Sequence, residues 1–213
     1  MLEMMPWIAV TLVALVGLLV TDRSGSLVRR GALKIMASTG FVVAAIVAGA
    51  FETAYGKVML VGLLFSWLGD TFLLSPSAQP FRAGLLSFLF AHVAFGIAFI
   101  VLGVTLRISA LALVALIPSG IVVGTWVLPR VPAGMRGPVI AYMVIISLMV
   151  ALAAGTLSGG HRVILVGAVL FYLSDLSVAR ERFVASGFIN ALWGLPLYYV
   201  AQLLLAYSVI LPR

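Results

Sequence analysis

The sequence contains no cysteine, and only 9% of its 213 residues are charged. The absence of cysteine excludes disulfides, thiolate catalysis and cysteine-ligated metals. In a soluble domain about a quarter of the residues are charged, whereas this chain is 64% hydrophobic. The core of a soluble protein of 213 residues is too small to bury so many apolar side chains. Most of these side chains must therefore face lipid or other helices. The composition therefore predicts an all-α, polytopic membrane protein.

Acidic residues and histidines are also scarce, with 6 Asp/Glu against 13 Lys/Arg and only 2 His. The basic residues stand singly between apolar runs, where they anchor helix ends, and they form no stripe with stacking aromatics. Nucleic-acid binding is therefore not expected. One of the two histidines, His161, lies in a predicted loop, so neither a metal site nor another cofactor is predicted.

Apolar runs long enough to cross a bilayer, about 20 residues each, alternate with loop signals such as Ser158-Gly159-Gly160. We predict a single integral membrane domain over residues 1–213. Its eight expected spans are 6–21, 33–51, 57–75, 82–105, 108–128, 138–157, 162–179 and 186–211.

Eight spans place both termini on one side of the membrane. The connections after the first, third, fifth and seventh spans carry nine basic residues: Arg23, Arg29, Arg30, Lys34, Arg82, Arg130, Arg136, Arg180 and Arg182. The opposite side carries four: Lys57, Arg107, Arg162 and Arg213. The positive-inside rule then predicts that the first side is cytoplasmic and that both termini are external, in a bacterial-type inner or cell membrane.

Two segments resemble one another. The segment GLLFSWLGD, from Gly62 to Asp70, matches GAVLFYLSD, from Gly167 to Asp175, with glycine eight residues before the aspartate in both. The third and seventh spans run in the same direction, so a parallel duplication of four plus four helices would fit, although two apolar helices can share this much by chance.

Asp70 and Asp175 are the only acidic residues within the predicted spans. A carboxylate at this depth is costly, so it faces the interior of the bundle and usually marks a functional site. The alternative is a helix-end residue that reaches the interface or pairs with a nearby arginine. The matched positions of the two aspartates, close to the same side, favour the functional interpretation.

Six predicted helices bring polar groups into the same leaflet, which predicts a pocket there. Besides the two aspartates, these groups are Lys34, Ser38, Ser66, His92, Arg136, Tyr142, Ser174, Asn190, Tyr198 and Gln202. Several recur every fourth residue, so they share one helix face. The alternative is that Ser66, Ser174, Asn190 and Gln202 only bond neighbouring helices.

An ordered set of motifs resembles the YhhN family of lysoplasmalogenase-like membrane proteins. The motifs are GLLFSWLGD ending at Asp70, F-x-x-G-x-x-x-F-x-x-x-H from Phe81 to His92, R-x-P-V-x-x-Y from Arg136 to Tyr142, G-A-x-x-F-x-x-S-D from Gly167 to Asp175, and Y-x-x-x-Q from Tyr198 to Gln202. The likeness runs from about Lys34 to Gln202. It departs at Lys34-Ile35, where the family commonly has Lys-Pro.

The resemblance implies an ether hydrolase that cleaves the vinyl-ether bond of lysoplasmalogens to a fatty aldehyde and a glycerophospho-alcohol. Such a bond is cleaved by protonating its β-carbon, after which water adds to the oxocarbenium ion. We expect Asp70 and Asp175 to be the acid/base pair, and His92 and Tyr142 to orient water or a carboxylate. Which aspartate is the acid stays open.

The expected partners are a lysophospholipid substrate and the surrounding membrane lipids. Lys34 and Arg136 would hold the phosphate, unless they only anchor the topology. The remaining predicted substrate-binding residues are Ser66, Ser174, Asn190, Tyr198 and Gln202.

Two alternatives stay open: a transporter or binding protein for lipids or small solutes whose aspartates carry protons, and a hydrolase of another lysolipid. The sequence predicts no oligomeric state.

Overall fold

The computed structural model describes residues 2–22, 26–75 and 77–211, and within these ranges every regular element is helical. Four short 3-10 helices accompany eight α-helices. The α-helices are α1 (Met5–Asp22), α2 (Leu27–Val47), α3 (Ala54–Phe72), α4 (Ala78–Leu102), α5 (Leu106–Val127), α6 (Ala133–Gly155), α7 (Arg162–Phe183) and α8 (Phe188–Tyr207). The prediction of an all-α membrane bundle with eight helices is confirmed.

Several predicted boundaries are wrong by a few residues. Helix α2 begins at Leu27, not at 33, so Arg29, Arg30 and Lys34 lie within the helix. Helix α6 begins at Ala133 and contains Pro138, where we had placed its start. Arginine and lysine are good helix formers, and their long side chains can reach the interface from inside a helix. These charges and this proline therefore do not mark loops here, and both helices are longer than the predicted spans.

The predicted turn near Arg107 is present and very short. Helix α4 ends at Leu102 and α5 begins at Leu106. Gly103 lies between them with a φ of 111°, a conformation that glycine adopts without strain. The amide of Thr105 donates to the carbonyl of Gly155, which ties this turn to the end of α6 at 3.0 Å.

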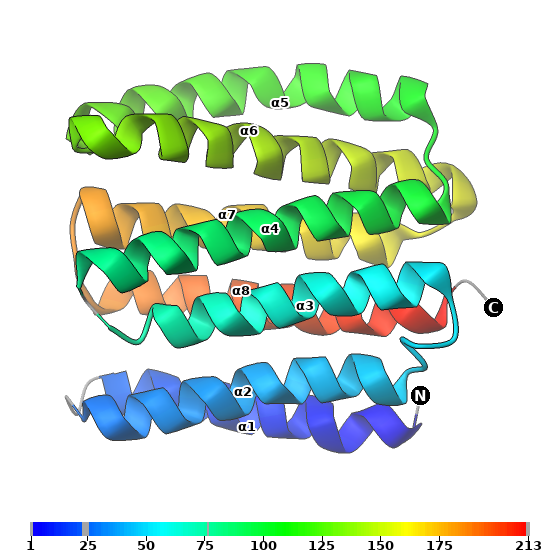
Figure 1. Ribbon diagram of the computed structural model, residues 1–213, viewed down its shortest axis with the longest axis horizontal. Helices are drawn as coiled ribbons and strands as arrows, with labels where there is room; N and C mark the ends of the chain where they lie inside the picture. The colour runs from blue at the N-terminus through cyan, green and yellow to red at the C-terminus, as the bar shows by residue number, and fades with distance from the viewer. Residues whose placement is uncertain (1, 23–25, 76, 212–213) are drawn as a thin grey trace.

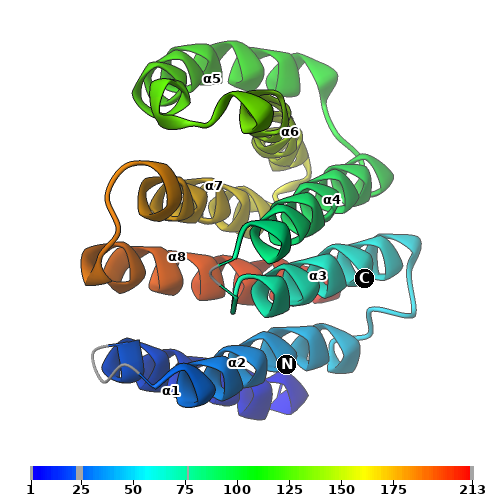
Figure 2. The same cartoon turned by 60° about the vertical axis from the view of Figure 1, so that its left-hand side comes forward.

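The helices form layers, as Figure 1 shows. Helices α3, α4, α7 and α8 occupy the middle, α1 and α2 lie on one side, and α5 and α6 lie on the other (Figure 2). Helix α2 packs on α3 and α8, and α6 packs on α7 and α4. Helices α2 and α6 thus have equivalent places in the two halves of the chain, which is the arrangement expected of a four-plus-four repeat.

Seven of the eight helices in the described part of the chain are long and apolar enough to cross a membrane, and α3 is the exception. Large hydrophobic side chains cover the outer surface; Val122 and Ile121 on α5, for example, are exposed. The chain is an integral membrane protein. Helix α3 runs beside α4 through the bundle (Figure 1), and its lower hydropathy goes with the polar residues that it carries into the interior.

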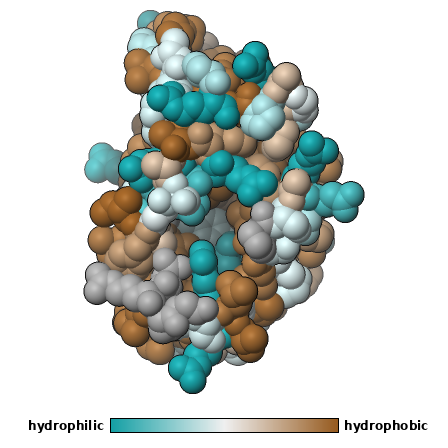
Figure 3. Space-filling view, turned by 90° about the vertical axis from the view of Figure 1, so that its left-hand side faces the viewer, coloured by the Kyte–Doolittle hydropathy of each residue, from teal (hydrophilic) through white to brown (hydrophobic). Residues whose placement is uncertain are grey.

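One end of the bundle gathers the connections α3–α4, α5–α6 and α7–α8 (Figure 1). Basic residues near helix ends there include Arg82, Arg130, Arg136, Arg180 and Arg182. Figure 3 views this end, where hydrophilic residues surround a hollow in the middle of the face. We call it the basic end. Arg23 and Arg213, which entered the charge count, lie outside the described residues.

Candidate active site

A cavity with about 1040 Å³ of empty space lies in the half of the bundle nearest the basic end. Seven helices, α2 to α8, contribute to its wall, and both intramembrane aspartates line it. This volume includes space that is open to solvent. The pocket predicted from the depth of the polar residues is therefore present.

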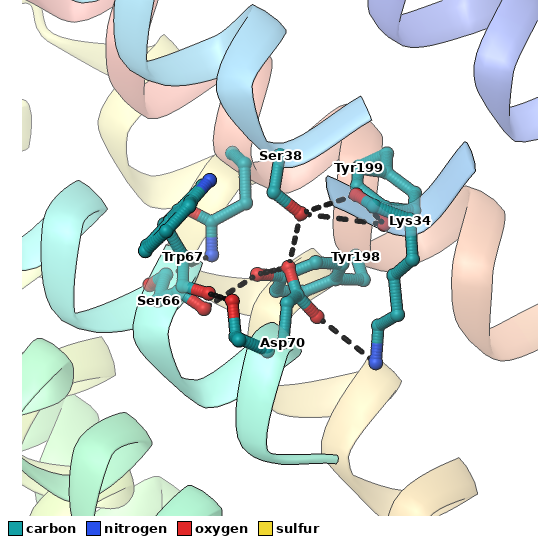
Figure 4. A network of polar contacts seen from close by, with 9 residues as sticks. Lys34, Ser38, Ser66, Trp67, Asp70, Tyr198 and Tyr199 are labelled. Carbon is teal, nitrogen blue, oxygen red and sulfur yellow. Dashed lines mark hydrogen bonds and ion pairs between the residues drawn. The ribbon is translucent and has the colours of Figure 1, made fainter. Parts of the chain in front are cut away.

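The carboxylate of Asp70 is the centre of a hydrogen-bond network that Figure 4 shows. Its Oδ2 atom accepts hydrogen bonds from Ser38 Oγ at 2.5 Å and from Tyr198 Oη at 2.6 Å. Its Oδ1 atom lies 3.2 Å from Lys34 Nζ, with which it forms an ion pair. The side chain of Asp70 is only 3% exposed. A cation and two hydroxyl donors therefore converge on this buried carboxyl group.

A second layer of polar groups holds this network in place. Tyr199 Oη donates to the carbonyl of Lys34 at 3.4 Å and lies 3.5 Å from Ser38 Oγ. Deeper in the bundle, Gln202 Nε2 donates to Ser66 Oγ at 3.2 Å. Ser66 and Gln202 are fully buried behind Asp70 and join α3 to α8. The rigid support comes from helices that are distant in the chain.

Asp175 has different partners. Tyr142 Oη, from α6, donates to Asp175 Oδ2 at 2.6 Å, and His92 Nε2, from α4, lies 3.5 Å from the same oxygen. His92 Nδ1 lies 2.6 Å from the carbonyl of Phe88. Because a carbonyl only accepts, Nδ1 must carry a hydrogen.

This tautomer decides what His92 can offer Asp175. In a neutral ring, Nε2 carries only a lone pair, so it can bond the carboxyl group only if Asp175 supplies the hydrogen. Otherwise the ring is doubly protonated and Nε2 supplies it. His92 Nε2 is buried and has no hydrogen-bond partner among the described residues, so it can accept a hydrogen from a protonated Asp175 carboxyl group 3.5 Å away.

Aromatic rings separate the two carboxyl groups. The ring of Phe171 lies 4.4 Å from that of His92 and 5.5 Å from that of Tyr198, measured between centroids. Phe88 packs edge-on against both Phe171 and Tyr198. No hydrogen bond joins the Asp70 and Asp175 networks within the ranges that the structure describes. They face one cavity from different walls, so a molecule in the cavity would connect them.

Comparison with known proteins assigns the chain to a family. A model of the YhhN family matches residues 29–209, which include every residue of the two networks. The chain belongs to the YhhN family. It is 30% identical over 172 residues to the lysoplasmalogenase TMEM86A of Bos taurus. That alignment covers 73% of this chain and 66% of the relative's length. No solved structure matches the chain significantly.

The predicted site residues of this YhhN protein fall into three groups. Six line the cavity: Lys34, Asp70, Tyr142, Ser174, Asp175 and Tyr198. His92, Ser66 and Gln202 are buried directly behind them. The cavity wall does not include the remaining two, Arg136 and Asn190. Ser174 donates to the carbonyl of Phe171 at 2.7 Å, so its hydroxyl bonds within its own helix.

Arg136 is exposed near the basic end, and its Nε donates to the carbonyl of Val131 at 3.2 Å. Asn190 ties together the connection between α7 and α8: it accepts from Arg180 and donates to Glu181 at 2.5 Å and to the carbonyl of Ala185 at 2.8 Å. A substrate-binding role for either residue stays a prediction.

Two further residues, Ser38 and Tyr199, belong to the Asp70 network; the sequence predicted Ser38 only as one of the pocket's polar groups and did not predict Tyr199. Ser38 stands one helical turn after Lys34, and this spacing could have identified it. Tyr199 directly follows Tyr198, so the two side chains leave α8 in different directions. Nothing in the sequence signals that both contact the same network.

Proposed function

We propose that this YhhN protein is a hydrolase that cleaves the vinyl-ether bond of lysoplasmalogens to a fatty aldehyde and a glycerophospho-alcohol. The observation that carries the proposal is one cavity, inside a membrane bundle, lined by two carboxyl groups with different partners. The similarity to a lysoplasmalogenase supports the choice of substrate.

The first step needs an acid. We assign it to Asp175, because the unpaired Nε2 atom of His92 lies 3.5 Å from its carboxyl group and can accept a hydrogen from it, and because its described partners, His92 and Tyr142, bring no fixed positive charge. Asp175 gives this proton to the β-carbon of the vinyl ether, which leaves an oxocarbenium ion. Tyr142 and His92 act as positioning residues, since each contacts the carboxyl group from its own helix.

The second step needs a negative charge and a base. We assign both to Asp70, which Lys34, Ser38 and Tyr198 favour in its ionised form. Its carboxylate stabilises the oxocarbenium ion across the cavity and takes a proton from the water that adds to it. The product is a neutral hemiacetal.

Collapse of the hemiacetal restores both groups. Asp70, now protonated, gives its proton to the glycerol oxygen as the carbon–oxygen bond breaks. Asp175, now ionised, takes the proton of the hemiacetal hydroxyl as the aldehyde forms. Each aspartate therefore ends the cycle as it began, and one water molecule is consumed.

Lys34 suits a second role at the cavity wall. Its side chain is 13% exposed, so its ammonium group borders both Asp70 and the cavity. A substrate phosphate placed beside it would gain a charge-assisted hydrogen bond. We propose that the head group lies on this side, and that Arg136, exposed near the basic end, attracts the phosphate from the protein surface.

The test is release of aldehyde from a lysoplasmalogen by purified protein in detergent, compared with Asp70→Asn, Asp175→Asn and, as an acidic control, Glu3→Gln. We expect activity in the wild type and in the control only. Glu3 is exposed at the start of the chain, which makes its substitution a matched loss of one carboxylate. Transport cannot yield aldehyde, so a wild type that releases none would leave the transporter alternative. Release of a fatty acid from an ester lysolipid would instead point to a different hydrolase.

A further inference from the structure

The wall of the cavity changes character from one side to the other. Lys34, Asp70 and Tyr198 lie on the side formed by α2, α3 and α8. The other side, between α4, α5, α6 and α7, also carries Tyr142, Asp175 and Ser177, but most of its lining is apolar. We call it the apolar lobe: Phe81, Leu85, Val123, Val127, Val139, Met143, Val178, Ala179 and Phe183.

The apolar lobe is covered towards the basic end. Phe81 and Phe183 pack edge-to-face with ring centroids 5.9 Å apart, and the guanidinium carbon of Arg182 lies 4.4 Å from the centroid of the Phe81 ring. Phe81 and Phe183 belong to a hydrophobic cluster that also contains the buried residues Val127 and Val139. A polar head group would lose its hydration in the lobe without gaining a partner, whereas a hydrocarbon chain would gain by leaving water.

The reactive groups lie between the two sides. Asp175 is on α7 and Tyr142 is on α6, the same helices that supply part of the lobe, and Asp70 faces them from the polar side. We propose that the apolar lobe binds the hydrocarbon chain of the lysolipid, with the head group towards Lys34 and the ether linkage between the aspartates. Val123, Val139 and Met143 then determine which chain lengths are accepted. This inference rests on the proposed function and adds the direction in which the substrate lies.

Helix α5 offers a matched pair of substitutions. Val123 lines the lobe, whereas its neighbour Val122 is 66% exposed on the outer surface. Val123→Trp fills part of the lobe, and Val122→Trp adds the same side chain on the lipid-facing side. Val139→Phe narrows the lobe from α6 and serves as the second variant, should Val123→Trp fail to fold.

The experiment measures binding of saturated decyl-ether and octadecyl-ether lysophosphocholines to the purified protein. These probes lack the vinyl double bond, so they are not cleaved and the result does not depend on catalysis. We expect Val123→Trp to lose roughly tenfold or more in affinity for the octadecyl probe and little for the decyl probe, while Val122→Trp binds both like the wild type. Binding of the decyl probe also shows that the variant is folded.

Equal effects of Val122→Trp and Val123→Trp would overturn the inference, as would weaker binding of both probes in parallel. If Val123→Trp binds neither probe, Val139→Phe decides by the same criterion. Aldehyde release by the wild type is measured separately. Selective binding without aldehyde release would keep the lobe and reject the proposed function, and aldehyde release without selectivity would do the opposite.

Discussion

The two intramembrane aspartates end two similar segments, Gly62 to Asp70 and Gly167 to Asp175, but have different neighbours. Asp70 on α3 is contacted by Ser38 from α2 and Tyr198 from α8. Asp175 on α7 is contacted by Tyr142 from α6 and His92 from α4. In the four-plus-four scheme α2 corresponds to α6 and α4 to α8, so each carboxyl group is held by one helix of its own half and one helix of the other half.

The correspondence fails at the lysine. Lys34 stands one helical turn before Ser38, and the residue one turn before Tyr142 is Pro138. Only Asp70 therefore gains an ammonium partner from this position. This difference between the two halves gives Asp70 a cation beside the hydroxyl donors Ser38 and Tyr198, whereas Asp175 is contacted by Tyr142 and His92. Two sites of common geometry can in this way take opposite roles in acid/base chemistry.

Replacing either aspartate by asparagine should have the largest effect. We expect Asp70→Asn and Asp175→Asn each to lose roughly a thousandfold in kcat, because each removes one of two groups that act in sequence. The double variant should be about as inactive as either single variant, since the remaining group cannot act alone. Aldehyde release is the measurement. A double variant that falls well below both single variants would mean that the two groups act independently.

Giving the second half the missing lysine should come next. Pro138→Lys places an ammonium group one turn before Tyr142, on the helix face that contacts Asp175. A nearby cation favours the ionised carboxylate, so Asp175 would no longer hold the proton it must donate. We expect a loss of roughly a hundredfold in kcat by aldehyde release.

Pro138→Gln is the control for Pro138→Lys, because it also removes the proline but adds no charge. It should keep most of the activity. If the two variants lose activity equally, the proline itself matters for α6, and the charge difference between the halves does not explain the roles of the aspartates.

Removing the natural lysine should have a smaller effect. Lys34→Met leaves Ser38 and Tyr198 in contact with Asp70 but takes away its ion-pair partner. We expect kcat to fall roughly tenfold and KM to rise, since the ammonium group also faces the cavity. Lys57→Met, at the other end of α3, is the matched control. Unchanged activity in Lys34→Met would remove the lysine from the mechanism.

The sequence was enough to predict the number of helices and the existence of the pocket. Apolar runs have a fixed minimum length in a bilayer, and a buried carboxyl group in lipid needs an interior partner, so both follow from local patterns. The motif that ends at Asp70 and recurs at Asp175 also located the two acids correctly on one cavity.

The sequence indicated that His92 and Tyr142 could orient a carboxylate, but it could not predict which aspartate each partner contacts, because the partners come from helices far apart in the chain. Nothing near Asp70 in the sequence points to Ser38 or Tyr198. The rotation of a helix about its axis is also a tertiary property. Arg136 and Tyr142 are both on α6, yet Tyr142 lines the cavity and Arg136 is exposed, because residues six apart lie on different faces of a helix.

The smallest effect is expected for Arg136, which lies on a different face of α6 from Tyr142. Arg136 contacts the carbonyl of Val131 and lies outside the cavity wall, so Arg136→Gln leaves both aspartate networks intact. We expect KM for a lysoplasmalogen to rise about two- to threefold through weaker attraction of the phosphate, with kcat unchanged. Lys34→Met should instead lower kcat, so comparing the two separates attraction of the phosphate from stabilisation of Asp70. A drop in kcat for Arg136→Gln that matches Lys34→Met would show that the two cations act together on the reacting groups.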